Sequence, residues 1–272
     1  MLSLQPHHIT DLYVLVDELL PVIPKPLGGR PELLAISELV TILLWNTLTV
    51  KQKTLKDIHN WVALYHHREF PTVPKYSAFV DQCHKAIPYL LRLLDHALAK
   101  TTSLRFADST MVEVCKLVRA DVHKVAKSVA AFGKNHQGWH YGFKLHATVD
   151  LKGRLCQAVI TPANFNDAQA LPKLVNNYTK LVIGDGGYTA HVMAEYLFKQ
   201  YGTIVISPPH PKQKRKVIMW WQHLLLTMRP KIESVWDYLK EHLHLVTSFP
   251  RSVKGYLLHY VRILLSYQLM HL

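Results

Sequence analysis

The spacing of apolar residues changes once along this chain, close to Thr101. Before that point, apolar side chains such as Leu12 and Val16 recur every three or four residues, as on one face of a helix. After it, short apolar or alternating runs of strand length are separated by Gly, Pro, Asn and Asp. The sequence therefore predicts an all-helical N-terminal region, residues 1–100, followed by an α/β domain, residues 101–272.

The N-terminal region is predicted to contain several helices separated by helix breakers. Leu12–Leu19 lies in the first helix, and the Pro- and Gly-rich segment Pro21–Pro31 is a linker. Further helical spacing covers residues 34–47, 54–65 and 79–98, with Pro88 marking a kink or a boundary in the last of these.

The segments after Thr101 follow a definite order. Leu104–Asp108 is a predicted strand, and two further runs form a predicted hairpin in which Gly153 takes the left-handed turn position. The remaining segments are a helix begun by Asn166 and Asp167, a strand at 180–183, a helix at 190–200, a strand at 203–206 and helix from about Val217. Three antiparallel strands followed by two strands reached through helical crossovers predict a ribonuclease H-like mixed five-stranded sheet with flanking helices.

Three acidic residues occupy special places in this order. Asp108 in RFADST and Asp185 in LVIGDGGY each follow an apolar, strand-like run, and Glu233 lies within the helical run RPKIESVWDYLK. In the predicted topology the first strand lies beside the strand that ends at Asp185, so the two aspartates are expected at neighbouring positions. Three carboxylates suit a site that holds two divalent metals for phosphodiester chemistry. Mg²⁺ is the expected ion because it prefers oxygen ligands, with Mn²⁺ as a substitute.

Each acid also has an ordinary explanation when it is taken alone. An aspartate after a strand is commonly a turn or helix-cap residue, and Gly186 and Gly187 fit a plain turn. A glutamate in a helix is commonly just solvated. The order of the three acids and the formal net charge of +13 together favour the catalytic interpretation, in which Asp108, Asp185 and Glu233 bind metal and carry the reaction.

The net charge of +13 indicates a polyanionic partner, and both nucleic acid and an anionic membrane fit that description. The best candidate for a membrane span, Leu33–Val50, contains Glu38 and Asn46 and is expected to be a core helix. No basic-then-apolar signal peptide is recognised at the start. The three cysteines are far apart in sequence, which favours a reducing, cytoplasmic setting without a membrane partner.

Basic residues cluster on both sides of the predicted hairpin and are candidates for phosphate contacts. The candidates are Lys124, Lys127 and Lys134 before the hairpin, and Lys212, Lys214, Arg215 and Lys216 before the last helices. Either run alone is commonly a solvated face. Trp220 and Trp221, which follow the second run, are expected in the core, with stacking on unpaired bases as the alternative.

Three segments resemble bacterial insertion-sequence transposases of the DDE class. They are FADST at Asp108, FGKNHQGWHYGFKLHATVD at Phe132–Asp150, and IGDGGY at Asp185 with RPKIESVWDYLK. The resemblance extends from about Pro31 to the C-terminus. The short interval between Asp185 and Glu233 leaves no room for a large insertion domain.

A subset of that family carries Tyr, Arg, Glu and Lys at fixed spacing on the last catalytic helix. Arg229, Glu233 and Lys240 match the last three places, whereas Leu226 stands in the place of the tyrosine. Pro230 disfavours helix at Arg229, which is therefore expected to precede the helix. Lys240 follows Glu233 by two helical turns and is expected on the same face, where it would contact a DNA phosphate together with Arg229.

The resemblance implies a DNA transposase that forms no covalent enzyme intermediate. Two metal ions would activate water to cut at the ends of an insertion sequence, and the freed 3′-hydroxyl would then attack target DNA. The implied partners are double-stranded DNA, as terminal inverted repeats and as target, and a second subunit, so that a homodimer forms on DNA. The implied setting is the bacterial cytoplasm, in association with the nucleoid. Two alternatives stay open: a nuclease of the same fold without strand transfer, and a catalytically inactive, transposase-derived DNA-binding protein.

Overall fold

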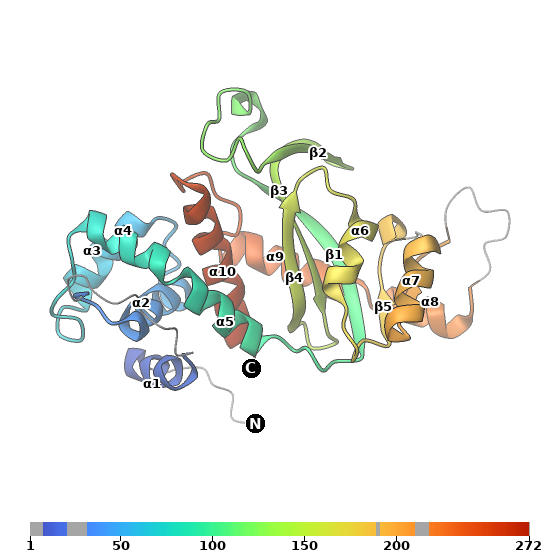
Figure 1. Cartoon of the computed structure of the whole chain (residues 1–272), viewed down its shortest axis with the longest axis horizontal. Coiled ribbons are helices and arrows are strands. Elements are labelled where there is room, and N and C mark those ends of the chain that lie inside the picture. The colour runs from blue at the N-terminus through green and yellow to red at the C-terminus, as the bar shows by residue number, and fades with distance from the viewer. Residues whose placement is uncertain (1–7, 21–31, 189–190, 210–217, 272) are drawn as a thin grey trace. The chain divides into compact units, whose positions relative to one another are not determined.

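The computed structural model describes residues 8–20, 32–188, 191–209 and 218–271 (Figure 1). The chain forms two compact units, one of residues 98–238 and one that combines residues 1–97 with 239–272. The last helix, α10 (Val253–Leu269), was expected within the α/β domain but packs with the helical unit, against α2 (Ile36–Thr49) and α5 (Ile87–Ala97). This helix is buried nearly all round, so it needs helical neighbours on several sides.

The remaining helices of the helical unit are α1 (Ile9–Leu19), α3 (Leu55–Tyr65) and α4 (Tyr76–Lys85). Two of its helices begin at a hydroxyl cap. Thr54 accepts from the Asp57 amide at the start of α3, and Ser252 accepts from the Gly255 amide at the start of α10. The predicted boundary near Pro88 lies between α4 and α5, so the expected helix at 79–98 is two helices.

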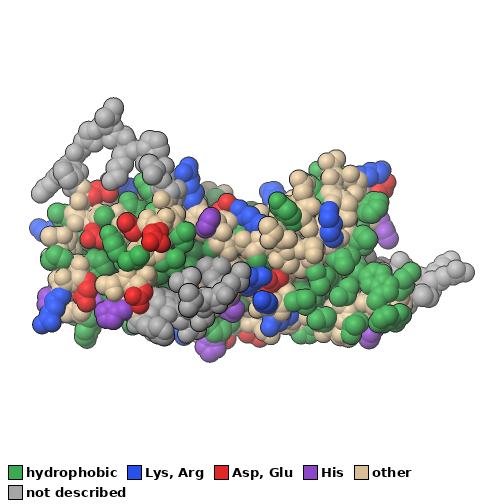
Figure 2. All heavy atoms as spheres, turned by 90° about the horizontal axis from the view of Figure 1, so that it is seen from below, with side chains coloured by type: hydrophobic (Ala, Val, Ile, Leu, Met, Phe, Trp, Pro, Cys, Tyr) green, Lys and Arg blue, Asp and Glu red, His purple; other side chains and the backbone are tan. Residues whose placement is uncertain are grey.

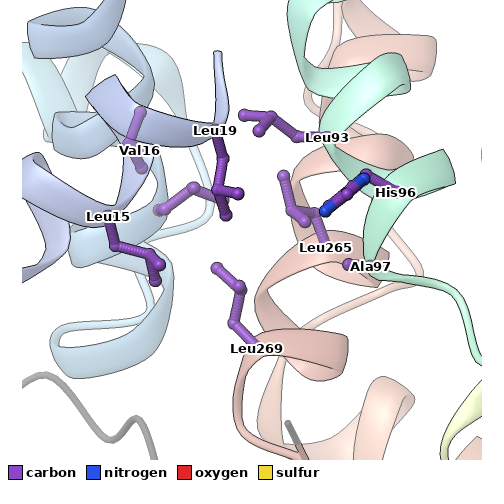
Figure 3. Close-up of a pocket in the computed structure, with 9 residues that line it drawn as sticks. Leu15, Val16, Leu19, Leu93, His96, Ala97, Leu265 and Leu269 are labelled. Carbon is purple, nitrogen blue, oxygen red and sulfur yellow. The ribbon is translucent and has the colours of Figure 1, made fainter.

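An apolar pocket of ≈ 280 Å³ lies inside the helical unit. Figure 3 shows Leu15 and Leu19 of α1 facing Leu93 of α5 and Leu265 and Leu269 of α10 across it. Such a lining offers water few polar partners and gives a ligand few groups to recognise. The pocket is therefore a packing gap beside α1, which forgoes part of the contact energy that a filled core would supply.

The second unit is built on a six-stranded mixed sheet. Its strands are β1 (Leu104–Glu113), β2 (Ala131–Asn135), β3 (Gly138–Val149), β4 (Leu155–Pro162), β5 (Leu181–Ile183) and β6 (Ile204–Ile206). β3 pairs antiparallel with β1, β2 and β4, whereas β5 runs parallel to both β1 and β6. The order β4-β3-β1-β5-β6 is that of the predicted ribonuclease H-like fold, to which β2 adds a short sixth strand.

Helices flank this sheet on the second unit (Figure 1). They are α6 (Asp167–Leu174), α7 (His191–Tyr201), α8 (Trp220–Thr227) and α9 (Pro230–Asp237), with short 3₁₀ turns at Leu117–Arg119 and Gly186–Tyr188. A core cluster joins β1, β5, α6 and α7 through Ala107, Leu171, Val175, Val182, Tyr188 and Leu197. α9 packs on β1. Among the described helices, none combines the length and the apolar character needed to cross a membrane.

The length of β1 differs from the sequence-based prediction. β1 continues to Glu113, so Asp108 lies within the strand and not at its end. The extension forms because Ser109–Glu113 keeps pairing with β3 after the parallel partner β5 has ended. The β3–β4 turn is as expected, since Gly153 has a φ of 83° that favours glycine.

Candidate active site

The parallel pairing of β1 and β5 places Asp108 and Asp185 side by side. Phe106 pairs with Ile183, and each aspartate lies two residues beyond its member of that pair. The two strands therefore bring the carboxylates of Asp108 and Asp185 to the same level of the sheet, as the sequence-based topology predicts. Burial raises the pKa of Asp108, and the negative charge of Asp185 adds to that effect.

Asp108 is half-buried and is held by the indole of Trp236. The Trp236 Nε1–H donates to Asp108 Oδ2 over 3.0 Å, which ties α9 to β1 at this point. Burial is the largest influence and raises the pKa of Asp108 above 3.8, although the Ser109 amide, Trp236 and Arg229 act to lower it. A partly desolvated carboxylate beside a second acid is a position where a bound cation would be strongly favoured.

Asp185 is fixed by the glycine turn that follows β5. The Gly187 amide donates to Asp185 Oδ1 over 2.9 Å. A Cβ placed on Gly187 would lie 3.1 Å from Asp185 Oδ1 and 3.2 Å from Asp167 Oδ2, so the turn passes closely between two carboxylates. A Cβ on Gly184 would lie 2.7 Å from the Tyr188 ring, which excludes larger residues there. The GDGGY sequence is therefore fitted to this turn and not to a generic loop.

We expect Gly187→Ala to lower metal-dependent cleavage by about tenfold while the fold is kept. The added methyl group would push apart the carboxylates of Asp185 and Asp167 by a few tenths of an ångström, and small displacements of catalytic groups are costly. Gly186→Ala is the matched control, because a Cβ there meets no heavy atom within 4 Å. Initial cleavage rates of both variants measure the effect, and equal rates would show that the close approach has no catalytic consequence.

Asp167 is a fourth acid at the site, and its place at the start of α6 predicts a helix-capping role. The cap of α6 is Asn166, whose side chain accepts from the Ala168 amide. This leaves Asp167 Oδ1 to accept from Ser109 Oγ over 2.7 Å and from Lys144 Nζ over 3.2 Å. His146 Nδ1 lies 3.4 Å away from the same oxygen. The paired Asn-Asp at the helix start was the available signal, because one residue suffices for the cap.

The network around Asp167 keeps its carboxylate ionised. Burial alone would raise the pKa of Asp167, but His146, the Ser109 hydroxyl and Lys144 outweigh it and lower the pKa below 3.8. Tyr188 lies nearby, and burial followed by the charges of Asp167, Asp108 and Asp185 raises its pKa, so its hydroxyl stays protonated. The carboxylate of Asp167 is thus compensated by the Lys144 cation, whereas Asp108 and Asp185 are two neighbouring carboxylates.

We expect Asp167→Asn to destabilise the fold by about 2 kcal/mol at neutral pH, because a buried network loses its charged acceptor. The folded-state pKa is lowered, so the stabilisation exists above the unfolded value near 4 and is lost as pH falls through the folded value. Urea unfolding of variant and wild type should therefore differ at pH 7, and the difference should shrink as pH falls through the folded-state pKa. Glu195→Gln, in an exposed pair with Lys199, serves as the control and should change little.

Glu233 is paired with Arg229 at the start of α9. Arg229 occupies the N-cap position of α9 with Pro230 in the first turn, so it precedes the helix as predicted. Its guanidinium forms an ion pair with Glu233 and also lowers the pKa of Asp108 by its charge. Arg229, Glu233 and Trp236 follow one another at intervals of four and three residues, which is one face of α9. This face meets β1 at Asp108.

Asp108, Asp185 and Glu233 are the side chains whose oxygens could bind a divalent metal. Within the described residues, no group of three or more His, Cys, Asp or Glu side chains is arranged to hold an ion. Glu233 is engaged by Arg229, while Asp108 and Asp185 form an adjacent pair of oxygen donors. Oxygen-only donors are the ligands that Mg²⁺ and Mn²⁺ prefer, whereas zinc and copper sites usually include histidine or cysteine. The aspartate pair therefore fits the metal. Glu233 is paired with Arg229 and would have to leave it to bind the same ion.

Lys240 lies beyond the end of α9, in a segment where the helix changes type. α9 ends at Asp237, and Tyr238–His242 forms one π-helical turn. A π turn contains more residues than an α turn, so two α-helical turns no longer relate Lys240 to Glu233. Lys240 also belongs to the helical unit. The same-face placement of Lys240 and its contact with DNA phosphate both stay predictions.

The basic candidates of the sheet unit lie on exposed segments. Lys124 and Lys127 are exposed in the segment between β1 and β2. Lys134 is on β2, with its Nζ 5.8 Å from the centre of the exposed Trp139 ring across the hairpin. A cation beside an exposed indole is suited to contact both the backbone and the bases of a nucleic acid. Lys212, Lys214, Arg215 and Lys216 lie outside the described residues.

The expectation that Trp220 is a core residue is wrong. Its side chain is 78% exposed, and α8 has no buried residue among its eight. Figure 2 shows hydrophobic side chains gathered on the sheet unit near the end that carries α7 and α8. The apolar composition of VIMWWQHLLL predicted burial, but the short helix packs too little of its surface against the sheet.

One family model and one solved structure are similar to this chain. A family model described as "Transposase DDE domain" matches residues 98–253. Among solved structures, the chain is similar to a "pre-cleavage Mos1 transpososome", with 13% identity over 91% of this chain and 80% of that chain and a TM-score of 0.23. A TM-score of that size says nothing about the fold, which is defined by the observed strand order.

Proposed function

The chain belongs to the transposase DDE domain family, and on that premise we propose that it cleaves DNA at the ends of a mobile element and joins them to target DNA. The observation that supports the proposal is the parallel pairing of β1 and β5, which brings Asp108 and Asp185 together, with α9 packed on β1 and carrying the Arg229–Glu233 ion pair. Asp108, Asp185 and Glu233 are the proposed catalytic residues.

The proposed cofactor is a pair of Mg²⁺ ions, for which Mn²⁺ would substitute. Asp108 and Asp185 would hold the metal, and Glu233 would complete the donor set after it leaves Arg229. Bound divalent metal supplies activation of the attacking oxygen and stabilisation of the leaving oxygen. Two hydrogen bonds support this role. The Gly187 amide binds Asp185 at Oδ1 and the Trp236 indole binds Asp108 at Oδ2, so each group orients its carboxylate through one oxygen only.

The protein's own residues have distinct parts in this proposal. The Trp236 indole and the Gly187 amide fix the two carboxylates, so that they need not reorganise during the reaction. Arg229 places a positive charge beside Asp108, where it would meet the negative charge of a phosphodiester. Asp167, with Lys144 and His146, supports the strand and the turn that carry the catalytic pair.

The proposed substrate is double-stranded DNA. The net charge of +13 supports a polyanionic partner. Lys124, Lys127 and Lys134 are exposed on the sheet unit, between Asp108 and Asp185 in sequence, and are the proposed contacts to DNA phosphates. Binding of two DNA ends by a homodimer is the arrangement that joining both ends to one target requires. Contacts from Lys240 and from the basic run at 212–216 belong to the same proposal.

The testing experiment follows end-labelled DNA that spans the flanks of the protein's own gene. Incubation with Mg²⁺ or Mn²⁺ should cut at the repeat ends, and an added plasmid should acquire the label if joining follows. Asp185→Ala should abolish both products. Cutting without joining would favour a nuclease of the same fold. Binding without cutting in either metal would favour an inactive DNA-binding derivative, and cutting that survives in Asp185→Ala would refute the catalytic assignment.

A further inference from the structure

The helical unit contains a second pocket, of ≈ 500 Å³, whose lining differs sharply from the apolar pocket beside α1. It lies where the starts of α3 and α10 come together, and α4 contributes to its wall. Lys53, Lys56, Arg251 and Arg262 line it, and its lining includes no aspartate or glutamate among the described residues. A pocket whose charged lining residues are all cations is electrostatically suited to an anion.

Arg262 makes this pocket unusual because its guanidinium is buried without a counter-ion. The residue is 4% exposed, and it forms no ion pair with a carboxylate of the described part of the chain. Its Nη2 lies 3.5 Å from Gln52 O and 3.3 Å from His259 Nδ1, whereas its buried Nη1 has no hydrogen-bond partner there. Burying a charged group with an unsatisfied donor is costly unless something supplies the missing charge and acceptor.

The neighbours of Arg262 do not supply that charge. His259 donates from Nε2 to His244 O, and burial, reinforced by Arg262, lowers the pKa of His259 to about 3, so it stays neutral. The buried Cys83 thiol is close enough to interact, but burial raises its pKa to about 12 and keeps it protonated. The positive charge of Arg262 therefore faces the pocket uncompensated.

Two helix N-termini add to the same positive field. Thr54 and Leu55 at the start of α3, and Ser252 and Gly255 at the start of α10, all line the pocket. The first amides of a helix have no intrahelical acceptor, and the N-terminal end of the helix carries a partial positive charge. Each hydroxyl cap serves one amide, at Asp57 and at Gly255, which leaves further first-turn donors for a ligand.

We propose that this pocket is a binding site for a phosphate group. A phosphate offers several acceptor oxygens at once, which matches an Arg donor, flanking lysines and helix amides better than a single carboxylate would. The net charge of +13 favours a phosphate of the DNA backbone as the source, with the free ion as the other source. The proposal does not depend on cleavage, because every residue that lines the pocket belongs to the helical unit, whereas Asp108 and Asp185 belong to the other unit.

The test compares two charge-matched double variants of the full chain. Lys53→Gln/Arg251→Gln removes two exposed cations that line the pocket, and Arg68→Gln/Arg92→Gln removes two exposed cations of the same unit that do not. Binding of a fluorescent DNA duplex is followed by anisotropy over a range of salt. We expect the pocket variant to lose about tenfold in affinity and about one unit of salt slope, beyond any loss in the control variant.

A second measurement uses inorganic phosphate alone. At matched ionic strength, phosphate should raise the Tm of the wild type and the control variant above the value in chloride, and should raise that of the pocket variant less. A loss of DNA affinity specific to the pocket assigns the phosphate to the DNA backbone. A Tm effect specific to the pocket without that loss assigns it to the free ion. If neither measurement separates the two double variants, the pocket is not a phosphate site.

Discussion

Asp108→Asn should abolish metal-dependent cleavage, with a loss of at least about 10³-fold, while the protein becomes no less stable. Several kcal/mol of transition-state stabilisation are expected from metal held by this carboxylate, and each 1.4 kcal/mol corresponds to about tenfold in rate. Asparagine has nearly the same shape and can still accept from Trp236 Nε1. The substitution therefore removes the charge and keeps the packing.

The stability result follows from the raised pKa of Asp108. Its pKa in the folded protein lies above the ordinary value of 3.8, first because of burial, so the folded state binds the proton more tightly than the unfolded chain does. Between the two values, the free energy of unfolding falls as pH rises, and the penalty persists above that window. Asparagine escapes this penalty, so the Tm of the variant at neutral pH should equal or exceed that of the wild type.

Asp121→Asn, which changes an exposed acid of the β1–β2 segment, is the control and should keep wild-type cleavage. A further arm records Tm with and without Mg²⁺. The ion should stabilise the wild type and the control but should stabilise Asp108→Asn less, because one ligand is lost. Undiminished cleavage by Asp108→Asn would refute the catalytic role, and a large fall in Tm would mean that the carboxylate is primarily structural.

The order of strands and the pairing of two acids could be predicted from the sequence because both depend on local patterns. Apolar runs of strand length and the Gly153 turn define the antiparallel part, and helical segments between later strands impose parallel pairing. Once β1 and β5 are neighbours, Asp108 and Asp185 must lie near each other. Their catalytic role is a further step that stays a prediction.

The features that escaped prediction depend on contacts between distant segments. Trp236 has the pattern of a core residue on α9, and its bond to Asp108 appears only when α9 lies on β1. Asp167 has the pattern of a cap until Asn166 takes that place. The π turn at Tyr238–His242 was not predicted either, because the apolar pattern reports helical spacing without distinguishing an α turn from a π turn.

Long-range packing also explains the assignment of α10. Its sequence is helical in any context, but the choice of neighbours is made by its wide apolar surface and by buried polar groups such as Gln268, which donates to Ala97 O over 2.8 Å. Residues on both sides of the α/β segment therefore build one helical unit. Sequence patterns alone cannot predict such a discontinuous unit, because they report period and not partner.

Arg105→Met should produce the largest loss of stability, about 3 kcal/mol, which corresponds to a fall in Tm of about 6–12 °C for a chain of this size. Arg105 is fully buried in β1, and its guanidinium donates to Thr102 O, Leu174 O, Lys100 O and Asn176 Oδ1. These bonds join the start of β1 to the end of α6. Methionine fills similar volume but provides no donors, so Thr102 O loses the one described side-chain donor that it has.

The expected loss is smaller than the sum of four charge-assisted bonds, because the substitution also removes the cost of burying a cation. Lys100 O and Leu174 O each keep one other donor, from Asn176 and Thr148. Urea unfolding at neutral pH measures the change, with the exposed Arg119→Met as a control that should stay within about 0.5 kcal/mol of wild type. A change below about 1 kcal/mol for Arg105→Met would mean that apolar packing, and not this guanidinium, joins β1 to α6. Because β1 carries Asp108 and α6 carries Asp167, the expected destabilisation should reduce cleavage as well, in proportion to the unfolded fraction.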